Sequence, residues 1–169
     1  AVAEVARCGL PLHNDRPKNW DLLVALGAIL AHTRPADPVL EMGAPRYSRL
    51  LPWLALFEYR ELDGIDLVFE AEVRDGPIRY RPMDLTATTF PDRSFAAIAC
   101  LSVVEHGVDI ERYLAEAGRL LRAAEVDLLY VFPLGYTTGM VVAPAVQGLT
   151  APIRLLNAHL DASYDYAGA

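Results

Sequence analysis

Short apolar runs alternate with amphipathic segments along this chain, and the alternation limits the folds that are open to it. The apolar runs have the length of strands and cover residues 39–43, 59–66, 78–83, 95–103 and 126–132. Helix-like segments cover residues 20–32, 48–57, 109–122 and 153–160. Strands that are apolar on both faces are typical of a parallel sheet covered by helices on both sides. We therefore predict an α/β fold with a mostly parallel, doubly wound, Rossmann-like sheet flanked by helices.

The size and charge of the chain restrict its partners. Its 169 residues suit one domain, and a hydrophobic content of 53% can fill a core. A net charge of -7 argues against nucleic acid or an anionic membrane surface as the main partner, and no apolar run reaches the roughly 18 residues that span a bilayer. Cys8 and Cys100 are far apart, so neither a metal site nor a disulfide is expected, and we predict a cytoplasmic protein.

Polar side chains stand where four of the predicted strands end. Glu41, Asp66 and Asp84 close the first three strands, and residues 102–106 follow the fourth, ending in His106. The carboxyl ends of parallel strands meet at one edge of a doubly wound sheet, where ligands bind. We therefore expect these side chains to border one crevice.

The loop after the first strand helps to decide which nucleotide-like ligand fits this crevice. It reads Gly43-Ala44-Pro45-Arg46-Tyr47-Ser48, with only the first glycine of the Gly-x-Gly-x-x-Gly pattern that approaches a dinucleotide's pyrophosphate. Pro45 also has no N–H to donate. S-adenosylmethionine (SAM) has no pyrophosphate, and free N–H groups at a helix start would suit the carboxylate of its methionine end.

Two acids have the placement that a SAM site needs. Asp66 follows Gly43 at about the spacing at which an acidic residue meets a ribose, and its carboxylate can accept from both hydroxyls. Asp84 can accept a hydrogen bond from the adenine amino group, with Met83 and Leu85 packing on the ring. Either acid alone could equally be an ordinary loop or cap residue, but their order along the chain favours SAM.

The sequence resembles class I SAM-dependent methyltransferases at several motifs. Residues 39–43 and 64–67 are similar to the first two motifs of that family. Four later runs resemble the core of its small-molecule, type 11-like branch, namely Asp84-Leu85-Thr86, residues 90–95, residues 102–106 and Glu116-x-x-Arg119-Leu120-Leu121. This resemblance implies a seven-stranded sheet of the usual methyltransferase order and SAM as the cofactor.

The resemblance also implies which residues contact the cofactor. Glu41 and Gly43 would lie by the methionine end, Asp66 by the ribose, and Leu101 and Ser102 under the cofactor. The full set of predicted contacts is Glu41, Gly43, Ala44, Ser48, Asp66, Leu67, Met83, Asp84, Leu85, Leu101 and Ser102.

Two segments depart from the family pattern. Ala44-Pro45-Arg46 stands where the family usually carries further glycines, and Ala123-Ala124-Glu125 stands where a Pro-Gly-Gly turn is usual. The irregular glycine loop keeps open a protein of this fold that binds without catalysing, as a partner or scaffold subunit. A nicotinamide-dependent oxidoreductase is a weaker alternative, because the loop lacks the required glycines and no Tyr-x-x-x-Lys pair occurs.

Residues for the acceptor side are harder to predict. His106 is the best candidate for a general base, because imidazole titrates near neutrality, although it could instead orient its loop. The polar segment 13–21 could form a lid or bind the acceptor, or simply lead into a helix with Asn19 as its cap. Tyr47 and Arg46 could line the crevice, and residues 136–138 could face the acceptor.

The sequence thus predicts a single SAM-binding domain over residues 1–169. Residues 1–37 would form a helical cap or lid, 38–132 the Rossmann-like core, and 133–169 the rest of the sheet and the acceptor side. The predicted function is SAM-dependent methyl transfer to a small-molecule acceptor, such as a sugar or another hydroxylated metabolite. The sequence is also compatible with a homodimer.

Overall fold

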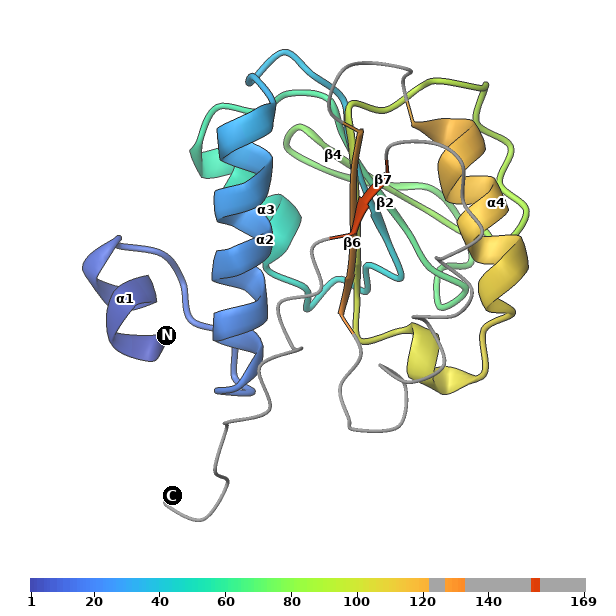
Figure 1. Ribbon diagram of the computed structural model, residues 1–169. Helices are drawn as coiled ribbons and strands as arrows, with labels where there is room; N and C mark the ends of the chain where they lie inside the picture. Colours follow the sequence, from blue (N-terminus) through green and yellow to red (C-terminus); the bar gives the residue numbers. More distant parts are fainter. Residues whose placement is uncertain (122–126, 133–152, 156–169) are drawn as a thin grey trace.

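A computed structural model of the chain describes residues 1–121, 127–132 and 153–155, and its elements form three layers (Figure 1). Helices α2 (Lys18–His32) and α3 (Leu50–Leu56) cover one face of a central sheet, and α4 (Ile110–Leu120) covers the other. A short helix, α1 (Val2–Arg7), packs against α2. This arrangement confirms the predicted α/β fold, with helices on both faces of the sheet.

The described strands form one sheet in the order β3-β4-β2-β1-β5-β6-β7. Their bounds are β1 (Val39–Met42), β2 (Leu62–Ile65), β3 (Val73–Asp75), β4 (Ile78–Arg81), β5 (Ala97–Leu101), β6 (Asp127–Phe132) and β7 (Ile153–Leu155). Every neighbouring pair is parallel except β3 and β4. The strand count that the family resemblance implies stays a prediction, because most of residues 133–169 lie outside the described part of the chain.

Two strands were not expected from the sequence. Residues 153–155 form β7, parallel to β6, so the helix predicted at that point is wrong for these residues. β3 arises from the short stretch between β2 and β4, and it runs antiparallel to β4 at the edge of the sheet. A two-residue turn joins them, and its Gly76 has φ +56°, which glycine adopts without strain. β2 and β4 are thus connected through an edge strand instead of a helix.

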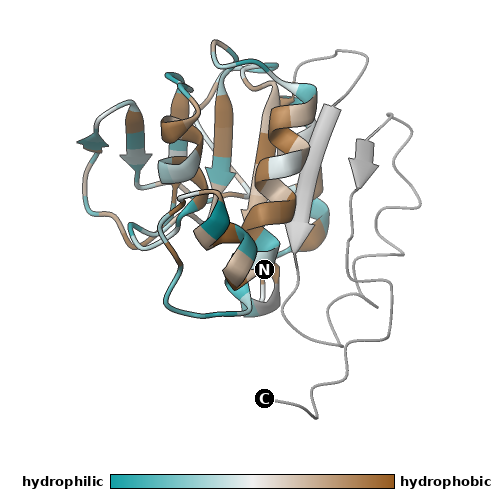
Figure 2. Cartoon of the chain, turned by 90° about the vertical axis from the view of Figure 1, so that its left-hand side faces the viewer, coloured by the Kyte–Doolittle hydropathy of each residue, from teal (hydrophilic) through white to brown (hydrophobic). Residues whose placement is uncertain are grey.

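The core has two parts, one on each side of the sheet. One part lies between the sheet and helices α1 to α3, and the other lies between the sheet and α4. Successive residues of a strand point to opposite faces, so Val39 joins the first part and Leu40 the second. All four residues of β1 and of β2 are buried, and Figure 2 shows the central strands largely in the colour of hydrophobic residues. Burial on both faces explains why these strands lack an alternating pattern.

The residues at which the helices begin differ in part from the prediction. The predicted helix at 20–32 is confirmed but begins at Lys18, so Asn19 lies within α2 and is not its cap. Asp109 caps α4 by accepting a hydrogen bond from the Arg112 N–H.

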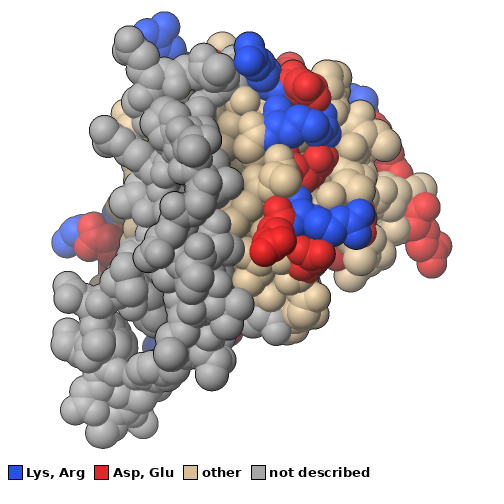
Figure 3. All heavy atoms as spheres, turned by 45° about the vertical axis from the view of Figure 1, so that its right-hand side comes forward, with Lys and Arg blue, Asp and Glu red and all other residues tan. Residues whose placement is uncertain are grey.

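On the face in Figure 3, basic and acidic side chains lie beside one another and not in patches of one sign. Within the described ranges, no helix is both long and apolar enough to cross a membrane.

Candidate functional site

Two adjoining cavities lie at the carboxyl ends of β1, β2, β4 and β5. The first has a volume of about 260 Å³ and the second about 370 Å³. Gly43, Asp66, Val103 and His106 border both, so they mark the line along which the cavities meet. This is the edge of a doubly wound sheet at which ligands bind.

The structure brings together His106 and every predicted cofactor contact except Ala44. The first cavity is bordered by Glu41, Ser48, Leu101 and Ser102, the second by Leu67, Met83, Asp84 and Leu85, and both by Gly43, Asp66 and His106. Ala44 is fully buried and borders neither cavity. Its N–H donates to the Ile65 carbonyl and its side chain packs close to Gly64, which turns it into the core and away from the crevice.

Gly43 and Val103 meet at the centre of the crevice. Gly43 has φ +74°, and a Cβ on it would overlap Cγ2 of Val103 and lie 3.0 Å from Cγ1. Only glycine therefore fits at this position without strain. Segment 102–106 was predicted to lie at the crevice, but Val103 was assigned no role of its own, because a valine in an apolar run carries no pattern that separates it from the core.

The N-terminal segment contributes one wall of the first cavity. His13, Lys18, Asp21 and Leu22 border it, and the prediction that segment 13–21 lies at the crevice is consistent with this placement. Tyr47 also borders this cavity, and its ring packs edge-on against His13 with centroids 6.4 Å apart.

Two further predictions about the acceptor side are not met or cannot be placed at the cavities. Arg46 borders neither cavity. Residues 136–138, predicted to face the acceptor, lie outside the described ranges. The N-terminal segment and Tyr47 are therefore the parts of the predicted acceptor side that lie at the crevice in the described structure.

The loop that follows β1 uses most of its backbone donors internally. The N–H groups of Gly43 and Ala44 both donate to the Ile65 carbonyl, at 2.8 and 2.9 Å. The Ser48 N–H donates to the Pro45 carbonyl at 2.8 Å, and Pro45 has no N–H. The expectation that free amides of this loop would receive a carboxylate is therefore not met at these positions.

Glu41 is a buried acid that borders the first cavity. Its Oε1 accepts a hydrogen bond of 2.6 Å from the Ser48 hydroxyl, while Oε2 has no hydrogen-bond partner among the described residues. Burial raises the pKa of Glu41 to about 7, against the opposing effects of the Ser48 hydroxyl and of the nearby Leu51 N–H, which both favour the carboxylate. A buried acceptor without a donor is costly, and a cation in the cavity would satisfy it. Glu41 therefore fits the ammonium group of a SAM-like ligand.

Asp66 and Asp84 are held by short turns at the ends of their strands. Asp66 Oδ1 accepts from the Val68 N–H at 3.0 Å, and the Asp66 N–H donates to the Arg81 carbonyl at 3.2 Å. Asp84 Oδ1 accepts from both the N–H and the hydroxyl of Thr86, each at 2.8 Å. These two bonds hold the pKa of Asp84 below its usual value, so it is a carboxylate at neutral pH.

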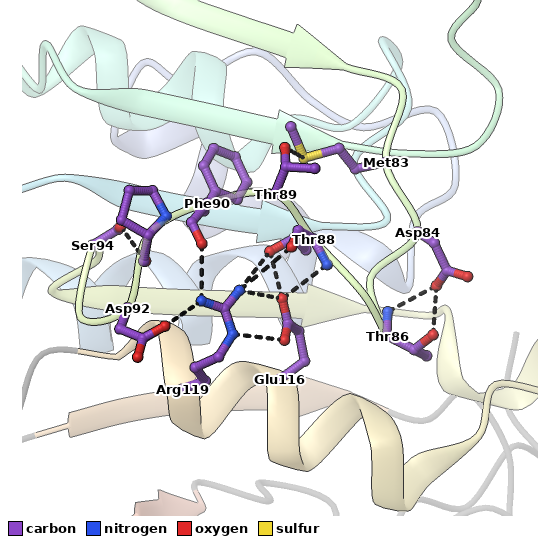
Figure 4. Close-up of polar contacts among 11 residues, drawn as sticks. Met83, Asp84, Thr86, Thr88, Thr89, Phe90, Asp92, Ser94, Glu116 and Arg119 are labelled. Atoms are coloured by element: carbon purple, nitrogen blue, oxygen red, sulfur yellow. Dashed lines mark hydrogen bonds and ion pairs between the residues drawn. The ribbon is translucent and has the colours of Figure 1, made fainter.

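An ion-pair cluster anchors the loop that carries Asp84 to helix α4 (Figure 4). Arg119 donates to Asp92 at 2.6 Å, to the Phe90 carbonyl at 2.9 Å and to both oxygens of Glu116. Glu116 also accepts from the N–H and hydroxyl of Thr88, at 2.8 and 2.6 Å. The Arg119 hydrogen bond is the main reason that the pKa of Glu116 is lowered to about 2. The residues of this cluster border neither cavity. They hold in place the loop that carries Asp84, and this loop forms one wall of the second cavity.

His106 and Ser102 lie in the segment after β5. His106 ends a short 3-10 helix, η1 (Val104–His106), and its exposed side chain borders both cavities. Ser102 has φ +57°, an uncommon conformation for a residue other than glycine. Such strain is often found at functional sites. No group of three metal-ligating side chains occurs in the described part of the chain.

Comparisons with known proteins agree with this geometry. A family model described as a methyltransferase domain, of type 11, matches residues 40–124. The YcgJ protein from Bacillus subtilis is 24% identical with a TM-score of 0.53 over 68% of this chain and 52% of its own. Phosphoethanolamine N-methyltransferase 2 from Haemonchus contortus, solved with phosphomonomethylethanolamine and S-adenosylhomocysteine, is 15% identical with a TM-score of 0.52 over 74% of this chain and 32% of its own.

The structural likenesses show a shared fold, and the chain spans about half or less of the length of these two proteins. The comparison with curated proteins found no match. The family model covers half of the chain and includes β1, β2, β4 and β5, whose ends form the crevice. The chain therefore belongs to the family of class I SAM-dependent methyltransferase domains, in its small-molecule, type 11 branch.

Proposed function

We propose that the two cavities together bind SAM and that the chain transfers its methyl group to a small-molecule acceptor. One observation carries the proposal: Glu41 lies near the end of β1, Asp66 and Asp84 come after the adjacent strands β2 and β4, and all three border one crevice. SAM needs an acceptor for its ammonium, a carboxylate for its ribose and an acceptor for its adenine amino group. The crevice offers these groups in the same order as the parts of SAM.

Each acid has a proposed partner in the cofactor. Glu41, whose Oε2 lacks a donor, accepts from the ammonium of the methionine end. Asp66 borders both cavities and accepts from the ribose hydroxyls. Asp84 accepts from the adenine amino group, and Met83 and Leu85, which border the same cavity, pack on the ring. Ser48, Leu67, Leu101 and Ser102 complete the proposed contacts.

Bound SAM supplies a methyl group that is already activated by the positive charge on sulfur. The chain's own residues then have to hold and align the reactants, and alignment alone can lower the barrier by roughly 7–11 kcal/mol. His106 borders both cavities at their junction, where an acceptor would meet the cofactor. For a hydroxyl acceptor, we assign to His106 the removal of the hydroxyl proton.

The acceptor is proposed to be a sugar or another hydroxylated metabolite. The first cavity is also bordered by His13 and Asp21, which can hydrogen-bond hydroxyl groups. The segment that carries them belongs to the proposed N-terminal cap, residues 1–37, next to the core of residues 38–132. The H. contortus relative was solved with a small molecule, phosphomonomethylethanolamine, and S-adenosylhomocysteine. A small-molecule acceptor agrees with the acidic charge of this chain better than nucleic acid does.

The cofactor assignment is tested by calorimetry with SAM and with S-adenosylhomocysteine (SAH). The wild type should bind both, and Asp66→Ala should weaken binding about 10- to 100-fold, as expected for a lost hydrogen bond to a charged group. Asp75→Asn removes an exposed acid from the β3 turn and should bind as the wild type does. Failure of the wild type to bind either compound would refute the cofactor proposal, and unchanged binding by Asp66→Ala would refute the role of Asp66.

A second candidate function is binding without catalysis. The observation that favours it is the loop after β1, whose amides at Gly43, Ala44 and Ser48 are used internally. A domain that binds SAM but transfers no methyl group to any hydroxylated acceptor in a radiolabel assay would support this alternative. Detection of methylated product would exclude it.

A further inference from the structure

The methionine end of SAM carries a carboxylate next to its ammonium, and the loop after β1 leaves few donors for that carboxylate. Gly43 and Ala44 donate to the Ile65 carbonyl, and Ser48 donates to the Pro45 carbonyl. Pro45 replaces one of the glycines whose amide would face a ligand, and it has no N–H. Most of these amides are therefore engaged, and a carboxylate in the first cavity would gain from a donor on another element.

Lys18, the first residue of α2, is the donor that the structure offers. It is half-buried and borders the first cavity together with Glu41. Throughout the described ranges, no carboxylate lies within ion-pair distance of Lys18. It is also the only lysine in the sequence, which otherwise uses arginine for its basic residues. Among the described residues, no arginine borders either cavity.

The backbone around Lys18 is held in place by its neighbour Asn19. The Asn19 side chain is fully buried, and its Oδ1 accepts from the His13 N–H at 2.9 Å. Its Nδ2 donates to the carbonyls of His13, Asp15 and Arg16, at 3.0 to 3.2 Å. These four bonds fix the turn that leads into α2, so Lys18 is presented to the cavity from a rigid segment.

We propose that Lys18 binds the carboxylate of the cofactor's methionine moiety, while Glu41 binds its ammonium. This inference rests on the proposed SAM site. An amino acid end carries one anion and one cation on the same carbon. The first cavity offers an opposite charge to each, with Lys18 from α2 for the anion and Glu41 from β1 for the cation. Asp21 and Asp66 are further acids at its border. Lys18 thereby takes over a role that the altered loop after β1 does not fill. An ammonium suits this role as a point charge with three donors.

The proposal is tested by comparing two ligands that differ only at the methionine end. SAH carries the amino acid, whereas 5′-methylthioadenosine keeps the adenosine and the sulfur but lacks the amino acid. By calorimetry, Lys18→Met should weaken SAH binding about tenfold or more and leave 5′-methylthioadenosine binding unchanged. Arg16→Met removes a positive charge from the same turn, at an exposed residue that borders neither cavity, and should change neither ligand.

The outcomes separate this proposal from the proposed function. If the wild type binds neither ligand, the SAM site itself is refuted. If the wild type binds both ligands and Lys18→Met leaves SAH binding unchanged, or weakens both ligands equally, the role of Lys18 is refuted while the SAM site stands. Equal thermal midpoints of Lys18→Met and the wild type would show that the variant is folded.

A second measurement uses the single lysine directly. An amine-reactive acylating reagent should modify Lys18, as located by mass spectrometry of the digested protein. SAH should protect Lys18 from modification at least tenfold, and 5′-methylthioadenosine at the same occupancy should not. Protection by both ligands, or by neither, would overturn the assignment of Lys18 to the carboxylate.

Discussion

The hydroxyl of Ser48 donates a 2.6 Å hydrogen bond to Oε1 of Glu41, and this bond joins the segment before α3 to the end of β1. The other oxygen, Oε2, is buried without a hydrogen-bond partner among the described residues, and Glu41 borders the first cavity. Burial raises the pKa of this acid from 4.5 to about 7. Glu41 is therefore mostly protonated below pH 7 until a cation reaches Oε2.

Replacing Glu41 by glutamine should change how stability depends on pH. The folded protein holds a proton on Glu41 that the unfolded chain releases above pH 4.5, so this contribution to stability is full below pH 4.5 and is lost as pH rises through 7. Glu41→Gln keeps a neutral side chain at every pH. In urea denaturation it should match the wild type at pH 4.5 and exceed it by on the order of 3 kcal/mol at pH 8.

The same variant should lose function while it gains stability. A neutral amide cannot pair with the ammonium of SAH, so calorimetry at pH 8 should show weaker binding by Glu41→Gln. Glu111→Gln, at an exposed position of α4, is the matched control and should follow the wild type in both measurements. Parallel pH profiles of Glu41→Gln and the wild type would contradict the raised pKa of Glu41.

Asn19→Ala should loosen the N-terminal wall of the crevice. The change removes four hydrogen bonds at a fully buried position and leaves backbone groups of His13 without partners. We expect a loss of about 2–3 kcal/mol in the free energy of unfolding. SAH binding should weaken as well, because Lys18 loses its fixed backbone. Destabilisation with unchanged SAH affinity would show that this turn does not position the site.

Gly43→Ala should be destabilising for two separable reasons. The φ of +74° costs a residue with a Cβ about 1–2 kcal/mol, and the overlap with Val103 adds about 1–3 kcal/mol. The double variant Gly43→Ala/Val103→Ala should recover the second part of the loss. Gly107→Ala is the control for the first part, because Gly107 has φ +86° and open space around it. Equal losses in Gly43→Ala and Gly107→Ala would contradict the close approach of Val103.

Arg119→Met should destabilise the loop between β4 and β5. It leaves Glu116, which is largely buried, without its main partner, and we expect a cost of about 1–3 kcal/mol at pH 7. The pKa of Glu116 is lowered to about 2, so its paired carboxylate stabilises the fold above pH 4.5 and loses this effect as pH falls toward 2. In urea denaturation the gap between variant and wild type should therefore narrow below pH 4.

The control for this variant lies on the same helix. Arg112→Met removes an exposed arginine from α4 that has no side-chain hydrogen bond or ion pair in the described part of the chain, and it should cost under about 0.5 kcal/mol. A gap between Arg119→Met and the wild type that stays constant from pH 7 to pH 3 would argue against the ion pair as its cause.

Most of the strands could be predicted from the sequence, because a short run of apolar residues indicates a strand that is buried in the core. The residues of β1 and β2 are apolar apart from Glu41, Asp63 and a glycine, and both strands are buried on both faces. β3 could not be predicted, because its three residues, Val73–Asp75, include two exposed charged side chains and gain strand structure only by pairing with β4. β7 was mistaken for a helix for a related reason: three residues are too few to show a period, and the pairing with β6 decides their structure.

The sequence by itself determined the α/β class. It also determined that Glu41, Asp66 and Asp84 stand at the ends of strands, because strand ends and polar residues are local properties of the chain. Only the tertiary structure decided that Ala44 faces the core, that Val103 closes over Gly43 and that Lys18 borders the cavity of Glu41. These relations join segments that are distant in sequence, so no local pattern carries them. The relation between Lys18 and Glu41 arises because α2 packs on the sheet with its first turn at the cavity that Glu41 borders.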